Sequence, residues 1–144
     1  MNIRLANPVE SPVLFELDHS QTFSAHWNEP DWQAELAEPA ARVWVALLGE
    51  KIVGFICARG AADQYEITNF AVEPSHTRQG IGRALLQQAL ENLQAIGAAH
   101  LTLEVSTANQ PARALYESAG METLGVRKQF YADGSDALIL GKKL

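Results

Sequence analysis

The chain has 144 residues, of which 47% are hydrophobic and 19% charged, a composition typical of a globular protein that forms one domain over residues 1–144. Its formal net charge of −6 argues against a broad surface for nucleic acid, because such surfaces are rich in lysine and arginine. No apolar run approaches the ~20 residues that a membrane span requires, and the start lacks a signal-peptide pattern, so we expect a cytoplasmic protein that contacts no membrane.

The cysteine and histidine content gives no sign of a metal centre. Cys57 is the one cysteine, which excludes an internal disulfide and a cysteine-based metal cluster. It lies in an apolar run, so we expect its side chain to be buried. The four histidines show no paired ligand spacing, and we therefore predict that the protein holds no metal.

The chain begins with a short strand and two helices. Residues 1–6 alternate apolar and polar side chains, which predicts the strand. A first helix is expected from Asn7, and a second one from the N-cap Asn28 to about Pro39. The apolar side of the first helix is expected to consist of Val9, Val13, Leu14 and Leu17.

Two large aromatic side chains, His26 and Trp27, precede the second helix. The simpler interpretation is structural, with Trp27 fixing the entry of the helix to the core. Alternatively, the pair lines a substrate groove, because aromatic residues in loops often serve recognition. The sequence leaves both interpretations open.

A β-hairpin follows the second helix. Residues 43–48 and 51–58 are rich in β-branched and aromatic residues, as strands are. The short connection between them contains Gly49, which suits a tight turn. The two segments therefore predict an antiparallel pair.

The next strand, residues 65–72, changes the phase of its alternation. Tyr65 and Ile67 share one face of a regular strand, whereas Phe70 and Val72 fall on the other. One inserted residue near Asn69 would produce this switch, so we predict a β-bulge there.

A polar turn and a helix come after this strand. The helix is predicted from Ile81 to Ile96, and Gly97 is its expected C′ residue. The turn and the first helical residues form the sequence Arg78-Gln79-Gly80-Ile81-Gly82-Arg83. Because the first N–H groups of a helix are unpaired and its N-terminus is positive, this stretch predicts a phosphate-binding site.

Two well-known phosphate-binding loops do not fit this stretch. A P-loop ends in Gly-Lys-Ser/Thr, and no lysine lies between Lys51 and Lys128. The dinucleotide-binding fingerprint needs a third glycine where Leu85 stands. A different kind of phosphate ligand is therefore indicated.

The rest of the chain completes an α/β fold. Residues 99–105 predict a strand parallel to residues 65–72, which makes a right-handed βαβ unit. A helix capped by Asn109 is expected to run to Gly120, and the strands 121–131 and 137–142 follow. The predicted fold is a mixed central sheet with a bulged strand, a βαβ core and helices on both faces.

The segment from Arg78 to Arg83 resembles the pyrophosphate loop of the GNAT superfamily of N-acetyltransferases. A second segment sharpens the resemblance: Leu103-Glu104-Val105 and Asn109, followed by Leu115-Tyr116-Glu117 before a glycine, is similar to the RimI-like ribosomal-protein alanine N-acetyltransferases. The likeness covers nearly the whole chain, including the stretch from Arg127 to Tyr131. The departures are Ser106 in place of the family's usual arginine, Met121 in place of phenylalanine and Phe130 in place of tyrosine.

The resemblance implies roles for particular residues. Glu104 would be the general base and Tyr116 the general acid in direct attack of an amine on acetyl-coenzyme A. Since Leu101, Leu103 and Val105 face one way, we expect Glu104 on the opposite face of a central strand, as an unpaired carboxylate, unless it lies at a solvated strand end. Tyr116 has the alternative role of an ordinary core aromatic.

The cofactor contacts implied by the resemblance extend from the loop to the strand before it. The pyrophosphate would be bound by Arg78, Gln79, Gly80, Ile81, Gly82 and Arg83. The pantetheine arm would pair with Phe70, Ala71 and Val72, and the N–H of Val72 would polarise the thioester carbonyl. Asn109 would contact the arm, unless it serves only as a helix cap.

Three functions remain open on the sequence. The first, implied by the resemblance, is acetylation of the N-terminal α-amine, that of alanine in the family's pattern, on a ribosomal protein as acceptor. The second is acetylation of a small-molecule amine such as a polyamine, amino acid or antibiotic. The third is a non-catalytic acyl-coenzyme A sensor, which would need the loop but neither Glu104 nor Tyr116.

Overall fold

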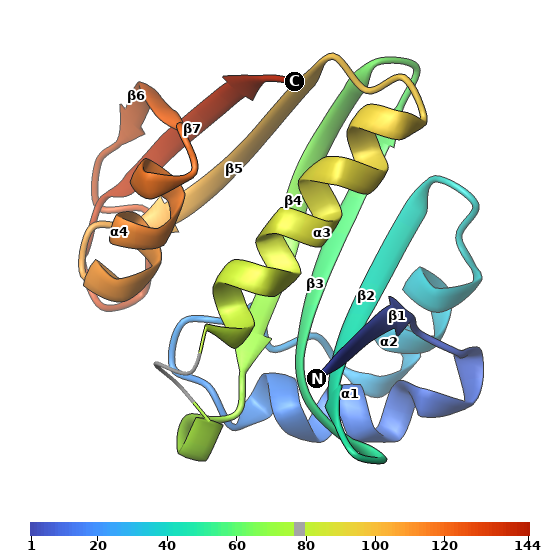
Figure 1. The fold of residues 1–144 in the computed structure, drawn as a ribbon. Coiled ribbons are helices and arrows are strands. Elements are labelled where there is room, and N and C mark those ends of the chain that lie inside the picture. The colour runs from blue at the N-terminus through green and yellow to red at the C-terminus, as the bar shows by residue number, and fades with distance from the viewer. Residues whose placement is uncertain (77–79) are drawn as a thin grey trace.

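The computed structural model describes residues 1–76 and 80–144, and in this part of the chain seven strands form one sheet in the order β1-β2-β3-β4-β5-β7-β6 (Figure 1). Neighbouring strands are antiparallel except β4 and β5, which are parallel. The mixed sheet and its βαβ unit are therefore confirmed. The strands are β1 (Asn2–Leu5), β2 (Ala41–Leu48), β3 (Lys51–Ala61), β4 (Gln64–Val72), β5 (His100–Ser106), β6 (Glu122–Arg127) and β7 (Ala137–Lys143).

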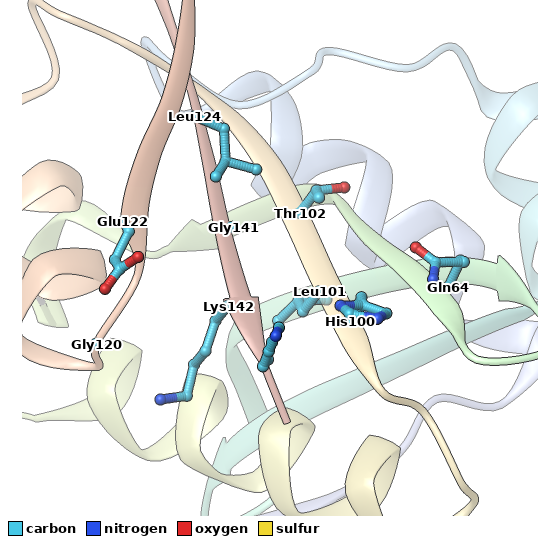
Figure 2. Close-up of a pocket in the computed structure, with 10 residues that line it drawn as sticks. Gln64, His100, Leu101, Thr102, Gly120, Glu122, Leu124, Gly141 and Lys142 are labelled. Carbon is cyan, nitrogen blue, oxygen red and sulfur yellow. The ribbon is translucent and has the colours of Figure 1, made fainter.

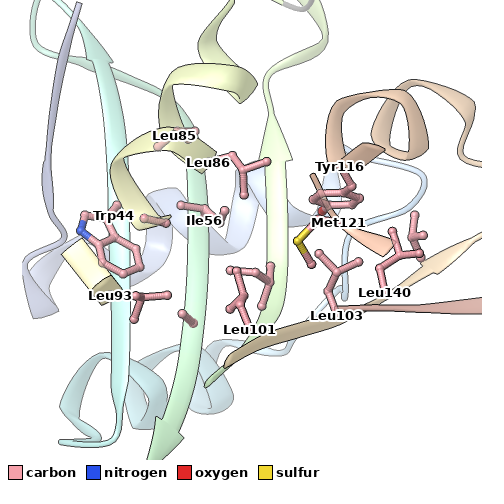
Figure 3. Packing of buried hydrophobic residues seen from close by; sticks show 14 of the residues in the cluster. Trp44, Ile56, Leu85, Leu86, Leu93, Leu101, Leu103, Tyr116, Met121 and Leu140 are labelled. Carbon is pink, nitrogen blue, oxygen red and sulfur yellow. The ribbon is translucent and has the colours of Figure 1, made fainter. Parts of the chain in front are cut away.

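Helices cover both faces of the sheet, as predicted, and each face has its own apolar layer. The four α-helices in the described residues are α1 (Ser11–His19), α2 (Glu29–Ala37), α3 (Ile81–Ala95) and α4 (Gln110–Ser118). Leu14 and Leu17 of α1 and Trp32 of α2 pack on one face, together with Phe55 and the buried Cys57. Figure 3 shows the other layer, in which residues of α3 and α4 pack against β2, β3, β5 and β7. None of the helices in the described residues is long and apolar enough to cross a membrane.

Two predicted segments differ from the structure in their extent. The first helix is preceded by a separate 3₁₀ turn, Pro8–Glu10, and the buried side of α1 is centred on Leu14 and Asp18. Val9 is 86% exposed and Val13 45% exposed, so their assignment to the buried side was wrong. The predicted strand 121–131 was too long, because β6 ends at Arg127, where the chain turns and Gln129 has φ 49°.

The bulge predicted in β4 is present. Cys57 pairs with Asn69 and the next residue, Ala58, pairs with Ile67, which leaves Thr68 as the inserted residue. Because of this insertion, Ile67 and Phe70 both pack in the layer under α3. Asn69 lies on the opposite face, toward α1, where it is 5% exposed.

The parallel strands β4 and β5 separate along their length. They pair over Gln64–Glu66 and His100–Thr102 and then diverge, and Figure 1 shows the two backbones moving apart beside α3. We call the region between the diverging strands the β4–β5 opening. It brings the end of β4, the start of α3, the end of β5 and α4 toward one region of the molecule.

Candidate active site

The first side of the β4–β5 opening is the unpaired backbone edge of β4. Phe70, Ala71 and Val72 pair with β3 on one edge. On the other edge no strand of the described chain pairs with them, since the ladder with β5 ends at Glu66. An extended ligand with amide groups can therefore bond to this edge as an additional strand would.

The start of α3 lies next to this edge. Gly80 is the N-cap with φ 79°, a left-handed conformation that favours glycine, and no side chain of residues 1–76 or 80–144 caps the helix there. A methyl group on Gly82 would lie 3.7 Å from Phe70 and Val72, so the first turn of α3 closely approaches β4. Ile81 is buried and can offer only its backbone, whereas Arg83 is exposed. The predicted contacts Arg78 and Gln79 lie outside the described residues.

Glu104 projects from the middle of β5 on the face opposite Leu101, Leu103 and Val105, as predicted. The expectation that its carboxylate is unpaired was wrong. The side chain is 33% exposed, and its Oε1 lies 3.2 Å from Nε of Arg127 on β6. This contact spans β7, which lies between the two strands, and it holds the carboxylate at the surface of the sheet.

Tyr116 lies on α4, is 5% exposed, and its ring centroid is 6.2 Å from that of Phe70. It therefore belongs to the core, and it also contacts the strand that borders the β4–β5 opening. Burial, with a smaller effect from Tyr131, raises the pKa of the Tyr116 phenol well above its usual value. The phenol consequently keeps its proton at neutral pH.

Tyr131 was not predicted as a site residue, although the resemblance covered it. Burial first, and then the charges of Glu104 and Asp133, raise the pKa of its phenol. The charge of Glu104 thus acts on the phenol of Tyr131, which itself has the smaller effect on Tyr116. The sequence placed it at the end of the predicted strand 121–131, which does not reveal which residues of β5 lie near it.

The loop that carries Tyr131 is attached to the end of β5 by Ser106, one of the residues that depart from the family pattern. Ser135 donates its hydroxyl hydrogen to Asp133, at 2.6 Å. The hydroxyl of Ser106 consequently donates to Ser135, also at 2.6 Å. This short chain of hydrogen bonds fixes the loop beside Glu104.

Asn109 acts as the N-cap of α4, because its Oδ1 accepts a hydrogen bond from the N–H of Ala112 at 3.4 Å. This is the capping role that the sequence left open. Among the described residues, no group of three or more His, Cys, Asp or Glu side chains is arranged to hold a metal ion.

A wide hollow of about 690 Å³ lies at the other end of β5, away from these residues. Figure 2 shows His100, Leu101 and Thr102 of β5 in it, together with Leu124 and Lys142. None of the described residues predicted to act in catalysis or cofactor binding lines it. The predicted site is instead the β4–β5 opening, which suits an extended ligand.

Comparison with known proteins identifies the family. The model of the acetyltransferase (GNAT) family matches residues 13–121. The chain belongs to this family. A GNAT acetyltransferase uses acetyl-coenzyme A as its co-substrate, so the protein is an acetyl-coenzyme A-dependent N-acetyltransferase.

The relatives of this GNAT chain include named N-acetyltransferases. It is 35% identical over 117 residues to the ribosomal protein bS18-alanine N-acetyltransferase of Escherichia coli K12, covering 79% of this chain and 78% of the relative. It is 34% identical over 116 residues to the N-alpha-acetyltransferase RimI of Mycobacterium tuberculosis, covering 77% and 72%. The crystal structure of the ribosomal-protein-S18-alanine N-acetyltransferase from Escherichia coli superimposes with a TM-score of 0.90 and 28% identity, covering 99% of this chain and 92% of that one.

The described residues fit acetyl-coenzyme A. The edge of β4 from Phe70 to Val72 is open for the amides of the pantetheine arm, and the uncapped start of α3 offers N–H groups to the pyrophosphate. The same fold is seen in yncA of Salmonella typhimurium with its cofactor acetyl-coenzyme A, at a TM-score of 0.84 and 18% identity, covering all of this chain and 94% of that one.

Proposed function

We propose that the protein transfers the acetyl group of acetyl-coenzyme A to the N-terminal α-amine of a ribosomal protein whose first residue is alanine. The observation that carries this proposal is that β4 and β5 diverge, so that Glu104 of β5 lies across the β4–β5 opening from the unpaired edge of β4, where Tyr116 packs beside Phe70. The names of the relatives support the choice of acceptor. Such an acceptor places the enzyme in the cytoplasm.

Glu104 and Tyr116 divide the proton transfers of the reaction. The amine nitrogen attacks the thioester carbonyl carbon, so that a C–N bond forms and the C–S bond breaks. Glu104 accepts the proton that the nitrogen loses, directly or through a water, and Tyr116 donates a proton to the departing sulfur. The N–H of Val72 polarises the carbonyl during the attack.

Acetyl-coenzyme A is bound mainly by backbone groups in this proposal. Residues 78–83 hold the pyrophosphate, Phe70 to Val72 pair with the pantetheine arm, and Asn109 contacts the arm from α4. No side-chain cap at Gly80 comes from the residues that the structure describes, which supports this arrangement, since the first N–H groups of a helix can bind an anion.

The acidity of amines favours an N-terminal acceptor. An α-amine with a pKa of about 7.7 to 8.0 is roughly a quarter neutral near pH 7.5, whereas a lysine amine near 10.4 is only about a thousandth neutral. Glu104 is a single, partly exposed carboxylate. It therefore suits the removal of a proton from the more acidic α-amine.

The test is the intact mass of a peptide that copies the N-terminus of small-subunit protein bS18, after incubation with the enzyme and acetyl-coenzyme A. We expect one added acetyl group, located on the α-amine by fragmentation and absent from a peptide whose α-amine is blocked. A peptide of the same sequence with an internal lysine and a blocked α-amine is the control for side-chain acetylation. No mass change in a preparation that binds acetyl-coenzyme A would reject the proposed acceptor, and acetylation within a panel of small amines would replace it.

Arg83 provides a test of the pyrophosphate contact. Arg83→Ala is expected to raise the Kd for acetyl-coenzyme A about tenfold, because one charge-assisted hydrogen bond to a phosphate contributes roughly a factor of ten to the affinity. Arg83 is exposed, so the fold should be unaffected. Titration calorimetry measures the affinity, and Lys143→Ala, which removes an exposed cation at the far end of β7, is the matched control. Equal affinities for all three proteins would exclude Arg83 from the site.

A further inference from the structure

A carboxylate is buried under the β4–β5 opening without a role in the proposed chemistry. Asp18, on α1, is 0% exposed. Its Oδ1 accepts a hydrogen bond from the N–H of His26 at 2.9 Å. Its Oδ2 accepts three more, from the N–H of Trp27 at 2.8 Å and from Trp32 Nε1 and Asn69 Nδ2 at 3.1 Å each. All four donors are neutral groups, so this charge is stabilised by directed hydrogen bonds, which fix the groups that make them.

Two of these four bonds hold one segment, residues 23–27, between α1 and α2. Besides His26 and Trp27, the hydroxyl of Ser24 donates to the backbone carbonyl of Asp18 at 2.6 Å. The segment has no regular secondary structure, and His26 has φ 57°, a conformation that a residue with a side chain adopts at a cost. Its shape therefore depends on the contacts to Asp18.

The fourth donor connects this segment to the bulge of β4. Asn69 donates to Asp18 and, through Oδ1, accepts hydrogen bonds from the N–H of Ala25 and the N–H of Phe70, both at 3.0 Å. Because Thr68 is inserted, the side chain of Asn69 points toward α1 while Phe70 points toward α3. One side chain thus joins the segment to the first residue of the edge that borders the β4–β5 opening.

The position of residues 23–27 relative to the site follows from these bonds. The segment is attached to β4 immediately before Phe70, on the sheet face that also carries Glu104. Figure 1 shows it passing the end of β4 at which the β4–β5 opening is widest. Phe23 and His26 are exposed there, whereas Trp27 packs against Trp32 in the core. The exposed residues of this segment are placed to contact an acceptor, while Trp27 anchors it.

We propose that Asp18 and Asn69 are positioning residues that fix residues 23–27 as the acceptor-side wall of the β4–β5 opening. This inference rests on the proposed function, because it assigns the wall to the acceptor and not to acetyl-coenzyme A. Loss of the link should loosen the wall and leave the contacts of β4 and α3 to the cofactor in place.

The main test is the variant Asp18→Asn. The asparagine side chain has the same size, but its amide nitrogen is itself a donor and cannot accept a hydrogen bond from an N–H group. We expect the KM for the amine substrate to rise about tenfold, since the loss of hydrogen bonds to a charged carboxylate corresponds to at least that factor. The kcat at saturating acceptor and the Kd for acetyl-coenzyme A should stay within about twofold of the wild type. A merely structural role would change all three together or none.

Glu35→Gln is the matched control. Glu35 is also a buried carboxylate, 8% exposed on α2, but it faces Arg59 of β3 at 3.6 Å, and none of its contacts involves residues 23–27. Its replacement should leave the acceptor KM unchanged. The inference fails if this variant raises the acceptor KM as much as Asp18→Asn does.

Two further measurements keep the inference testable if Asp18→Asn does not fold or the bS18 peptide is not the acceptor. Ser24→Ala removes one neutral hydrogen bond in an irregular segment, and it should raise the acceptor KM about threefold without changing the Kd for acetyl-coenzyme A. Amide hydrogen exchange needs no acceptor, and it should show faster exchange at His26 and Trp27 in Ser24→Ala, with unchanged rates in β4. Unchanged exchange in residues 23–27 overturns the link itself, whereas faster exchange with an unchanged KM for every accepted amine overturns its role in acceptor binding.

Discussion

Replacing Glu104 by glutamine is expected to lower kcat for peptide acetylation by about 10²- to 10⁴-fold, the range that a positioned general base contributes. The amide cannot accept the proton that the attacking amine must lose. The affinity for acetyl-coenzyme A should be unchanged, because Glu104 lies on β5 and the proposed cofactor contacts lie on β4, on α3 and at the start of α4. Single-turnover kinetics and titration calorimetry measure the two quantities on the same preparation.

The ion pair of Glu104 makes a control necessary, because the glutamine variant also removes a contact with Arg127. Arg127→Ala breaks the same pair and keeps the carboxylate. We expect it to retain most of the activity, since partly exposed ion pairs contribute only about 0 to 1 kcal/mol. If the two variants lose activity equally, the orientation of Glu104 by Arg127 matters more for activity than proton acceptance by Glu104. If Glu104→Gln keeps full turnover, the assignment of Glu104 as the general base is wrong.

The sequence predicted the parts of the fold that depend on local patterns. The alternation in residues 65–72 located the bulge to within one residue, because an inserted residue moves every following side chain to the other face. Gly80 and Gly82 marked the start of α3 in the same way, with Gly80 as its N-cap. Each of these signals is contained in a short stretch of chain, which is why it can be read without the structure.

The surroundings of the site residues depend on contacts between distant segments, and here the sequence was insufficient. The partner of Glu104 comes from β6, two strands away in the sheet, so the carboxylate could not be recognised as paired. The end of β6 depends on Asp136, which accepts a hydrogen bond from the N–H of Gln129 at 2.9 Å across the turn. Asn69 and Asp18 are 51 residues apart, and a buried asparagine in a strand gives no indication of its partner.

Tyr116→Phe is expected to lower kcat about 10²-fold, at the lower end of the range for a proton donor, because a thiolate needs less assistance in leaving than an amine would. Removal of a hydroxyl from a ring in the core should not reduce stability, since no hydrogen bond to this hydroxyl was found among the described residues. The Kd for acetyl-coenzyme A and the melting temperature should therefore stay at the wild-type values. Rapid-quench kinetics at saturating substrates would measure the chemical step directly.

The pH dependence follows from the pKa of Tyr116, which burial raises above the ordinary value of 10.0. The phenol of the wild type stays protonated across pH 7 to 9, so kcat should not fall in this range through loss of the acid, and the deficit of Tyr116→Phe should be constant there. Tyr65→Phe is the matched control: Tyr65 also packs against the core layer under α3, but at the closed end of β4, where it pairs with Leu101. A loss of activity in Tyr65→Phe as large as that in Tyr116→Phe would indicate a packing effect. Full activity of Tyr116→Phe would mean that another group protonates the departing sulfur, and the phenol of Tyr131, on which the charge of Glu104 acts, would be the next candidate.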